Sequence, residues 1–147
     1  PEPQLQSVCL NERVAACKMF METVCRNRNI TLHMTLCDEN PRVNMDTSLF
    51  EQVLVNIIKN AAESIGGEGN IFIRTSVFPT MLEIADTGAG ISKEVEAKLF
   101  SPFFSTKPNG QGIGLIFIRE VLMKHGCTFS LRTYSDGLTR FRIRFNA

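Results

Sequence analysis

Apolar positions recur along the chain in two different periods, one typical of helices and one typical of strands. Over residues 11–29 they return every three or four positions, which predicts an amphipathic helix with Asn11 as its N-cap. Residues 30–36 alternate between apolar and polar, which predicts a half-buried strand. A longer helical stripe covers residues 46–65, where Asp46 is suited to cap the start and glycines follow the end.

The rest of the chain predicts more strands, one further helix and a long loop. The strand-like runs are residues 70–78, 81–85, 128–134 and 139–145, and a turn over residues 135–137 joins the last two. Residues 42–45 form a short segment that follows a turn over residues 39–41. Residues 113–125 predict a helix that ends before Gly126. Residues 87–111 are rich in glycine, serine and proline, with a short helical stretch near residues 93–100, and loops of this length are usually functional. Together, these helices and strands predict a single α+β domain, a two-layer sandwich in which a mixed, mainly antiparallel sheet is covered by three helices.

Length, composition and net charge limit the kinds of protein that this chain can be. With 147 residues, 44% of them hydrophobic, and a net charge of +1, the chain matches one ordinary globular domain. A charge-driven nucleic-acid binder would show a basic excess, so nucleic acid is not an expected partner. Alternating Arg140, Arg142 and Arg144 predict a solvated basic strand face. No apolar run reaches the ~20 residues needed to cross a bilayer. A cytoplasmic domain is expected, compatible with a membrane anchor upstream.

Two asparagines form the first candidate for chemistry. Asn56 and Asn60 lie four residues apart on the predicted helix over residues 46–65, one turn above the other. Asn60 falls at the margin of the apolar stripe, where an amide oxygen suits a hard cation such as magnesium. The alternative is a pair of exposed asparagines on a solvated face. Because asparagine is a modest helix former, the pair slightly favours a functional role.

A second motif, from Asp86 to Gly90, follows a hydrophobic strand directly. The carboxylate of Asp86 accepts hydrogen bonds only, which fits the exocyclic amino group of adenine. Gly88 and Gly90 would let the backbone approach a flat base closely. Taken alone, the motif fits equally a tight turn with an acidic cap.

A third motif, from Gly110 to Gly114, opens the predicted helix over residues 113–125. Glycine-rich backbone at a helix N-terminus offers N–H groups and a positive dipole end to phosphates. The spacing is not that of a P-loop. Just before these glycines, Thr106 supplies a hydroxyl and Lys107 a cation that is a candidate for the charge of a terminal phosphate.

The three motifs, in this order, resemble the N, G1, F and G2 motifs of the Bergerat-type ATP-binding fold. The chain is most similar to the catalytic ATP-binding domain of sensor histidine kinases, over nearly its whole length. The resemblance implies ATP and Mg²⁺ as cofactors, with Asn60 binding magnesium and Asp86 reading adenine. It further implies that Gly88 and Gly90 shape the base pocket, that residues 92–109 form a mobile lid, and that Thr139 supports the adenine site. Other positions with implied nucleotide contacts are Ile91, Thr106, Gly110, Gly112, Gly114 and Leu115.

Asn56 separates the branches of this superfamily. In gyrase and the heat-shock chaperones, a glutamate one turn before the magnesium-binding asparagine activates water. Asn56 is no base, which favours phosphoryl transfer over hydrolysis. The candidate catalytic residues are Asn56, for this reason, and Lys107, for the charge of the terminal phosphate. The resemblance implies a protein-histidine kinase whose acceptor histidine lies on a dimerisation domain absent from this chain. A response regulator and a homodimeric full-length protein are the implied partners.

His33 and His125 lack the acidic neighbour and the helical setting of an acceptor histidine, so neither is expected to be phosphorylated. Two further readings stay open. One is a hydrolysing ATPase or an anti-sigma-type serine kinase on the same fold, which Asn56 disfavours. The other is a degenerate binding module, which departures from the family pattern at Gln111 and Ile116 keep open.

Overall fold

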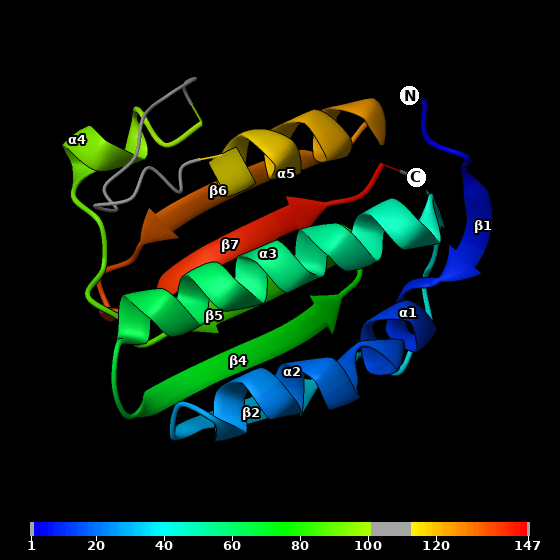
Figure 1. Cartoon of the computed structure of the whole chain (residues 1–147). Helices are drawn as coiled ribbons and strands as arrows, with labels where there is room; N and C mark the ends of the chain where they lie inside the picture. Colours follow the sequence, from blue (N-terminus) through cyan, green and yellow to red (C-terminus); the bar gives the residue numbers. More distant parts are fainter. Residues whose placement is uncertain (1, 101–112, 147) are drawn as a thin grey trace.

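The sheet and its helices form two layers (Figure 1). The structure is a computed structural model that describes residues 2–100 and 113–146. Its larger sheet has the strand order β2 (Ile30–Thr35), β4 (Gly69–Ser76), β5 (Met81–Asp86), β7 (Thr139–Arg144) and β6 (Thr128–Thr133). β2 pairs with β4 in parallel, and the other pairs are antiparallel. The predicted mixed, mainly antiparallel sheet is confirmed.

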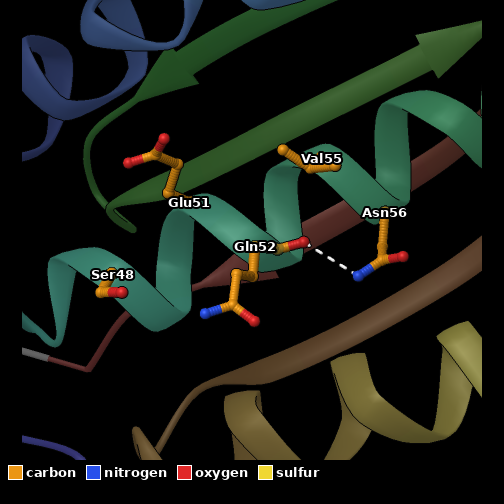
Figure 2. A pocket seen from close by; sticks show the side chains of 5 residues that line it. All are labelled: Ser48, Glu51, Gln52, Val55 and Asn56. Carbon is orange, nitrogen blue, oxygen red and sulfur yellow. Dashed lines mark hydrogen bonds between the residues drawn. The ribbon is translucent and has the colours of Figure 1, made fainter.

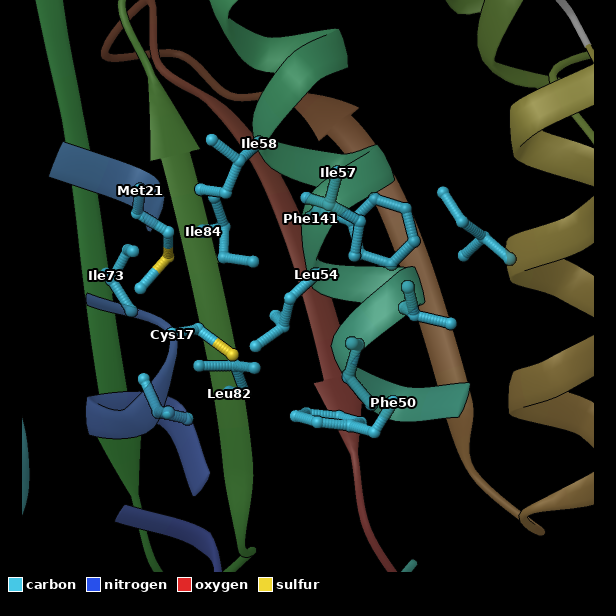
Figure 3. Packing of buried hydrophobic residues seen from close by; sticks show 14 of the residues in the cluster. Cys17, Met21, Phe50, Leu54, Ile57, Ile58, Ile73, Leu82, Ile84 and Phe141 are labelled. Atoms are coloured by element: carbon cyan, nitrogen blue, oxygen red, sulfur yellow. The ribbon is translucent and has the colours of Figure 1, made fainter. Parts of the chain in front are cut away.

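Helices α2, α3 and α5 lie on one face of this sheet (Figure 1). The helices are α1 (Leu10–Ala16), α2 (Lys18–Arg26), α3 (Thr47–Ile65), α4 (Lys93–Glu96) and α5 (Ile113–Lys124). The core fills the space between the layers (Figure 3), where burial of apolar surface supplies most of the driving force for folding. Its members from α3 and the sheet include Phe50, Leu54, Ile58, Ile73, Leu82, Ile84 and Phe141. Within the described residues, no helix is both long and apolar enough to cross a membrane.

Helix α3 has the boundaries that the sequence predicts. The Asp46 side chain accepts a hydrogen bond from the Leu49 N–H at 3.1 Å, as an N-cap does. The helix ends at Gly66, whose φ of +77° suits glycine and whose N–H bonds to the carbonyl of Ala62. Because both ends are fixed by local chemistry, Asn56 and Asn60 sit on a well-defined helix.

The N-terminal part differs from the prediction in two ways. A short strand, β1 (Gln6–Cys9), pairs with β3 (Arg42–Met45) and leads directly into the first helix, so Asn11 is not its cap. Asn11 is instead buried, with only 6% exposed, where it donates to the Cys37 carbonyl and accepts from the Thr75 hydroxyl, both at 2.7 Å. The expected single helix is also interrupted at Cys17, which separates α1 from α2.

The arginines of β7 lie on the outer face of the sheet, but the expected solvated basic face is only partly present. Arg142 donates to Glu83 at 2.8 Å, and the Nε of Arg140 lies 3.6 Å from the same carboxylate. The Glu83 side chain is only 8% exposed, and both guanidinium groups stack over the Tyr134 ring. The strand register, which pairs Glu83 with Arg142, therefore turns part of this face into a neutralised ion cluster. Arg144 stays exposed, as predicted.

Candidate functional site

Asp86 closes β5 with a carboxylate that is almost entirely removed from solvent. Its residue is 5% exposed, and its Oδ1 accepts the N–H of Gly88 at 2.8 Å. Burial raises the pKa of Asp86 from 3.8 to about 6, partly offset by the hydrogen bond from Gly88. An acceptor held in so little water discriminates strongly between ligands that donate to it and ligands that do not.

The loop after Asp86 packs tightly against the end of α3, which explains its glycines. A Cβ on Gly88 would lie 2.3 Å from the Ser64 hydroxyl oxygen and 2.8 Å from the Ser64 carbonyl carbon. Gly90 has a φ of +79°, a conformation that other residues rarely adopt. The Ala89 N–H donates to the Ser64 carbonyl at 3.2 Å. The strand end and the helix end are therefore held together around Asp86.

Thr139 lies beside Asp86, and sequence reasoning missed the residue next to it. Thr139 is the register partner of Asp86 on β7 and is 5% exposed. Its hydroxyl oxygen lies 2.8 Å from that of Thr133, and Thr133 accepts the Ile91 N–H at 2.8 Å. A signal for Thr133 was present, since the predicted turn over residues 135–137 places it opposite Thr139. The two hydroxyls link the loop around Ile91 to β7, whose Thr139 is the register partner of Asp86.

Glu96 joins the segment after Ile91 to the C-terminal end of β6. The Glu96 carboxylate, on α4, accepts the Thr133 N–H at 3.2 Å. Ser92 caps α4 by accepting the Val95 N–H at 3.2 Å. The backbone and hydroxyl of Thr133 thus hold both Ile91 and Glu96, where the predicted lid begins.

Asn56 of α3 borders a hollow of about 390 Å³, which Glu51 and Gln52 of the same helix also line. Asn56 donates to the Gln52 carbonyl at 3.0 Å, and a Cβ on Gly114 would lie 3.6 Å from its Oδ1. In Figure 2 the side chains of Gln52 and Asn56 point toward α5, whereas Glu51 points away from it. Asn60, one turn further along, is partly exposed beside buried Ala61 and Ala62, as its predicted place at the margin of the apolar stripe requires.

The remaining candidates divide between described and undescribed parts of the chain. Gly114 and Leu115 form the first turn of α5, and Leu115 packs against the core. Phe100 is anchored edge-on against Phe129, with ring centroids 5.2 Å apart. Half of the predicted lid over residues 92–109 lies outside the described residues, as do Thr106, Lys107, Gly110 and Gly112.

Both histidines are engaged in contacts within the domain. His125 uses one ring nitrogen toward the Asp46 N–H at 3.0 Å and the other toward the Val121 carbonyl at 2.8 Å. His33 stacks on Phe72, with ring centroids 4.6 Å apart, and contacts Asn70 through Nε2. That neither histidine is a phosphoacceptor stays a prediction.

Comparison with known proteins identifies the class of domain. The catalytic domain of the histidine kinase ThkA is 28% identical and superimposes with a TM-score of 0.85, covering 97% of this chain and 95% of that one. The mycobacterial sensor histidine kinase MprB is 25% identical, with a TM-score of 0.81 and 97% coverage of both chains. The fold is therefore that of histidine kinase catalytic domains.

The sequence comparisons give the family. Residues 45–147 match the family described as histidine kinase-, DNA gyrase B- and HSP90-like ATPase, and the chain belongs to this family of nucleotide-binding domains. The C4-dicarboxylate transport sensor protein DctS of Rhodobacter capsulatus is 33% identical over 147 residues, 96% of this chain. The signal transduction histidine-protein kinase AtoS of Escherichia coli K12 is 34% identical over 125 residues, 83% of this chain. The chain spans about a fifth of the length of these relatives, 22% and 21%.

Proposed function

We propose that this chain is the ATP-binding catalytic domain of a sensor histidine kinase. It would present the γ-phosphate of ATP to a histidine on a dimerisation domain of the same full-length protein. The observation that carries the proposal is the side of α3 that faces α5, where Gln52 and Asn56 offer amides and Glu51 points away. Asn56 is not a base, and Glu51, although it lines the same hollow, points away from α5, so transfer to a better nucleophile than water is favoured.

The end of the proposed site that would hold the nucleobase has the polar groups that adenine needs. The lone pairs of the Asp86 carboxylate that Gly88 does not use would accept the exocyclic amino group, and the Thr139 hydroxyl next to it would add a second polar contact. The backbone at Gly88 and Gly90 would border the flat base. Thr133 supports both parts, because it holds Ile91 and Thr139 at 2.8 Å each.

The phosphate end fits a magnesium ion that takes most of its ligands from phosphate and water. Among residues 2–100 and 113–146, no cluster of three or more His, Cys, Asp or Glu side chains could hold a metal. A single amide oxygen from Asn60 is the protein ligand we assign, in keeping with the preference of Mg²⁺ for oxygen and retained water. When bound, Mg²⁺ and ATP supply the phosphoryl group and the charge neutralisation that its transfer needs.

The chain's own residues would position and stabilise, which is the usual share of a protein in phosphoryl transfer. Asn56, oriented by its bond to the Gln52 carbonyl, would direct its amide oxygen toward the start of α5. The N–H groups from Gly110 to Gly114 would meet the phosphates. Thr106 and Lys107, in the lid that we propose over residues 92–109, would add a hydroxyl and a positive charge.

The same proposal extends to partners. The histidine kinase ThkA has been solved in complex with the response regulator protein TrrA. The kinase in that complex is 27% identical to this chain, covers 97% of it and superimposes with a TM-score of 0.79. We therefore propose a response regulator as the next phosphoryl acceptor, and a homodimeric full-length protein whose catalytic domain works in the cytoplasm.

Phosphoryl transfer in trans tests the proposed function. The chain is mixed with the dimerisation domain of the same full-length protein and ATP labelled at the γ-phosphate. Label that appears on the dimerisation domain, is stable to base and is released by acid would support a histidine kinase. Label released only as inorganic phosphate would support a hydrolysing ATPase, and no nucleotide binding would support a degenerate module.

A further inference from the structure

Three segments of the chain meet at Asp46. Its Oδ2 accepts the Gln4 N–H at 2.9 Å, and its Oδ1 accepts the Leu49 N–H at 3.1 Å. Its own N–H donates to Nε2 of His125 at 3.0 Å. The hydrogen bonds from Gln4 and Leu49 lower the pKa of Asp46, so the carboxylate stays ionised at neutral pH. One residue therefore joins the N-terminal segment, the start of α3 and the end of α5.

The contacts of His125 fix its protonation pattern. Nδ1 lies 2.8 Å from the Val121 carbonyl, which only accepts, so Nδ1 carries the ring proton. Nε2 then has a lone pair to accept the Asp46 N–H. The backbone N–H of His125 also bonds to the Val121 carbonyl, at 3.0 Å. The ring is thereby tied to its own helix on one side and to the start of α3 on the other.

Helices α3 and α5 approach each other at a second place, near the proposed phosphates. A Cβ on Gly114 would lie 3.6 Å from Oδ1 of Asn56. At ~1.5 Å per residue, Asp46 to Asn56 spans about 15 Å and His125 to Gly114 about 16.5 Å. The two helices therefore run antiparallel, and the two contacts are separated by similar lengths along each helix. Because a helix is stiff along its axis, a shift at His125 would move Gly114 relative to Asn56.

We propose that His125 is a positioning residue that fixes the register of α5 against α3. It would thereby set the distance between Gly114, in the first turn of α5, and the amides of Asn56 and Asn60. The inference rests on the proposed nucleotide site and adds a residue far from it. The adenine end, formed by Asp86 and Thr139 on the sheet, does not depend on this register. Loss of the His125 contact should weaken binding of the phosphates and spare binding of the base.

Two substitutions at this position separate the hydrogen bond from the ring. His125→Phe keeps the bulk and removes both nitrogens, whereas His125→Gln supplies an amide oxygen at the place of Nε2 that can accept the Asp46 N–H. Lys124→Ala, a change at the exposed last residue of α5, is the matched control. Affinities for ATP with magnesium and for adenosine are measured by titration of folded protein. His125→Asn, whose short amide does not reach Asp46, replaces the Phe variant if that variant does not fold.

The Phe variant should lose about five- to tenfold in ATP affinity, the worth of one hydrogen bond, with adenosine affinity unchanged. The Gln variant should recover most of the loss, and Lys124→Ala should behave as the natural chain. Equal losses for ATP and adenosine would mean general destabilisation and would overturn the proposal. Unchanged ATP affinity in the Phe variant would overturn it as well.

A measurement without nucleotide separates this proposal from the proposed function. The side-chain amide signal of Asn56 and the backbone amide signal of Gly114 are followed by NMR in the free protein. Both should move in His125→Phe and return in His125→Gln. If the natural chain binds neither ligand, the proposed function fails while these signals still report the helix register. Signals that stay in place in the Phe variant would overturn the role of His125.

Discussion

Replacing Asp86 by asparagine is expected to stabilise the nucleotide-free domain at pH 7 and to remove its affinity for adenine nucleotides. Asparagine keeps the size of the side chain and an oxygen for the Gly88 N–H, which Asp86 accepts at 2.8 Å. It removes a negative charge that is 5% exposed. Because a buried charge is poorly solvated, the folded state gains from the substitution even though the proposed site loses its acceptor.

The magnitude follows from the pKa of Asp86, which burial raises from 3.8 to about 6. At about 1.4 kcal/mol per pH unit, ionising Asp86 in the folded chain costs about 3 kcal/mol at pH 7. A raised pKa means that the folded chain binds this proton more tightly than the unfolded chain. Stability of the natural chain should therefore fall as pH rises from about 4 to about 6, and the advantage of Asp86→Asn should grow over the same range.

Urea unfolding at pH 7 and at pH 3.5 measures both effects, with ATP titration of the same samples. We expect Asp86→Asn to be more stable by up to about 3 kcal/mol at pH 7 and equal to the natural chain at pH 3.5. Asp136→Asn is the control, since the hydrogen bond from Arg140 lowers the pKa of that carboxyl and its replacement should bring no gain at pH 7. An Asp86→Asn variant that is less stable at pH 7, or whose advantage persists in acid, would show that the buried Asp86 charge does not destabilise the folded chain.

Three further substitutions probe other parts of the molecule. Asn60→Ala should abolish magnesium-dependent ATP binding and leave adenosine binding in place; calorimetry with and without magnesium decides, and unchanged ATP binding would remove the metal assignment. Thr133→Val should weaken ATP binding about tenfold by releasing the Ile91 N–H, whereas Thr133→Ser should not, as nucleotide titration will show. Asn11→Ala should destabilise the fold by about 1–3 kcal/mol in urea unfolding, because the Thr75 hydroxyl loses its buried acceptor; a neutral effect would contradict the importance of that bond.

Features fixed by local chemistry could be predicted from the sequence. Helix α3 is bounded by Asp46 and Gly66 because a cap and a left-handed glycine act within one turn of the helix end. The hairpin of β6 and β7 follows in the same way from its turn. The strand order could not be predicted, since the parallel pairing of β2 with β4 joins residues nearly forty positions apart.

The sequence predictions that were wrong or incomplete share one physical cause, a contact between residues far apart in the chain. Asn11 has the chemistry of a cap, but a strand that precedes it and the distant Thr75 hydroxyl give it a buried role. The alternating arginines of β7 predicted a solvated face, but the sheet register places Glu83 next to Arg140 and Arg142. Thr133 gains its place in the site only when Ile91 folds back onto it. In each case a long-range contact overrides a local preference.

Phosphoryl transfer without hydrolysis is the central claim, and a single experiment on the 147-residue chain tests it most directly. ATP is titrated calorimetrically with and without magnesium while released phosphate is followed over time. We expect magnesium-dependent binding with no steady release of phosphate. Binding accompanied by steady phosphate release would contradict it, because it would show that the site activates water although Asn56 is no base.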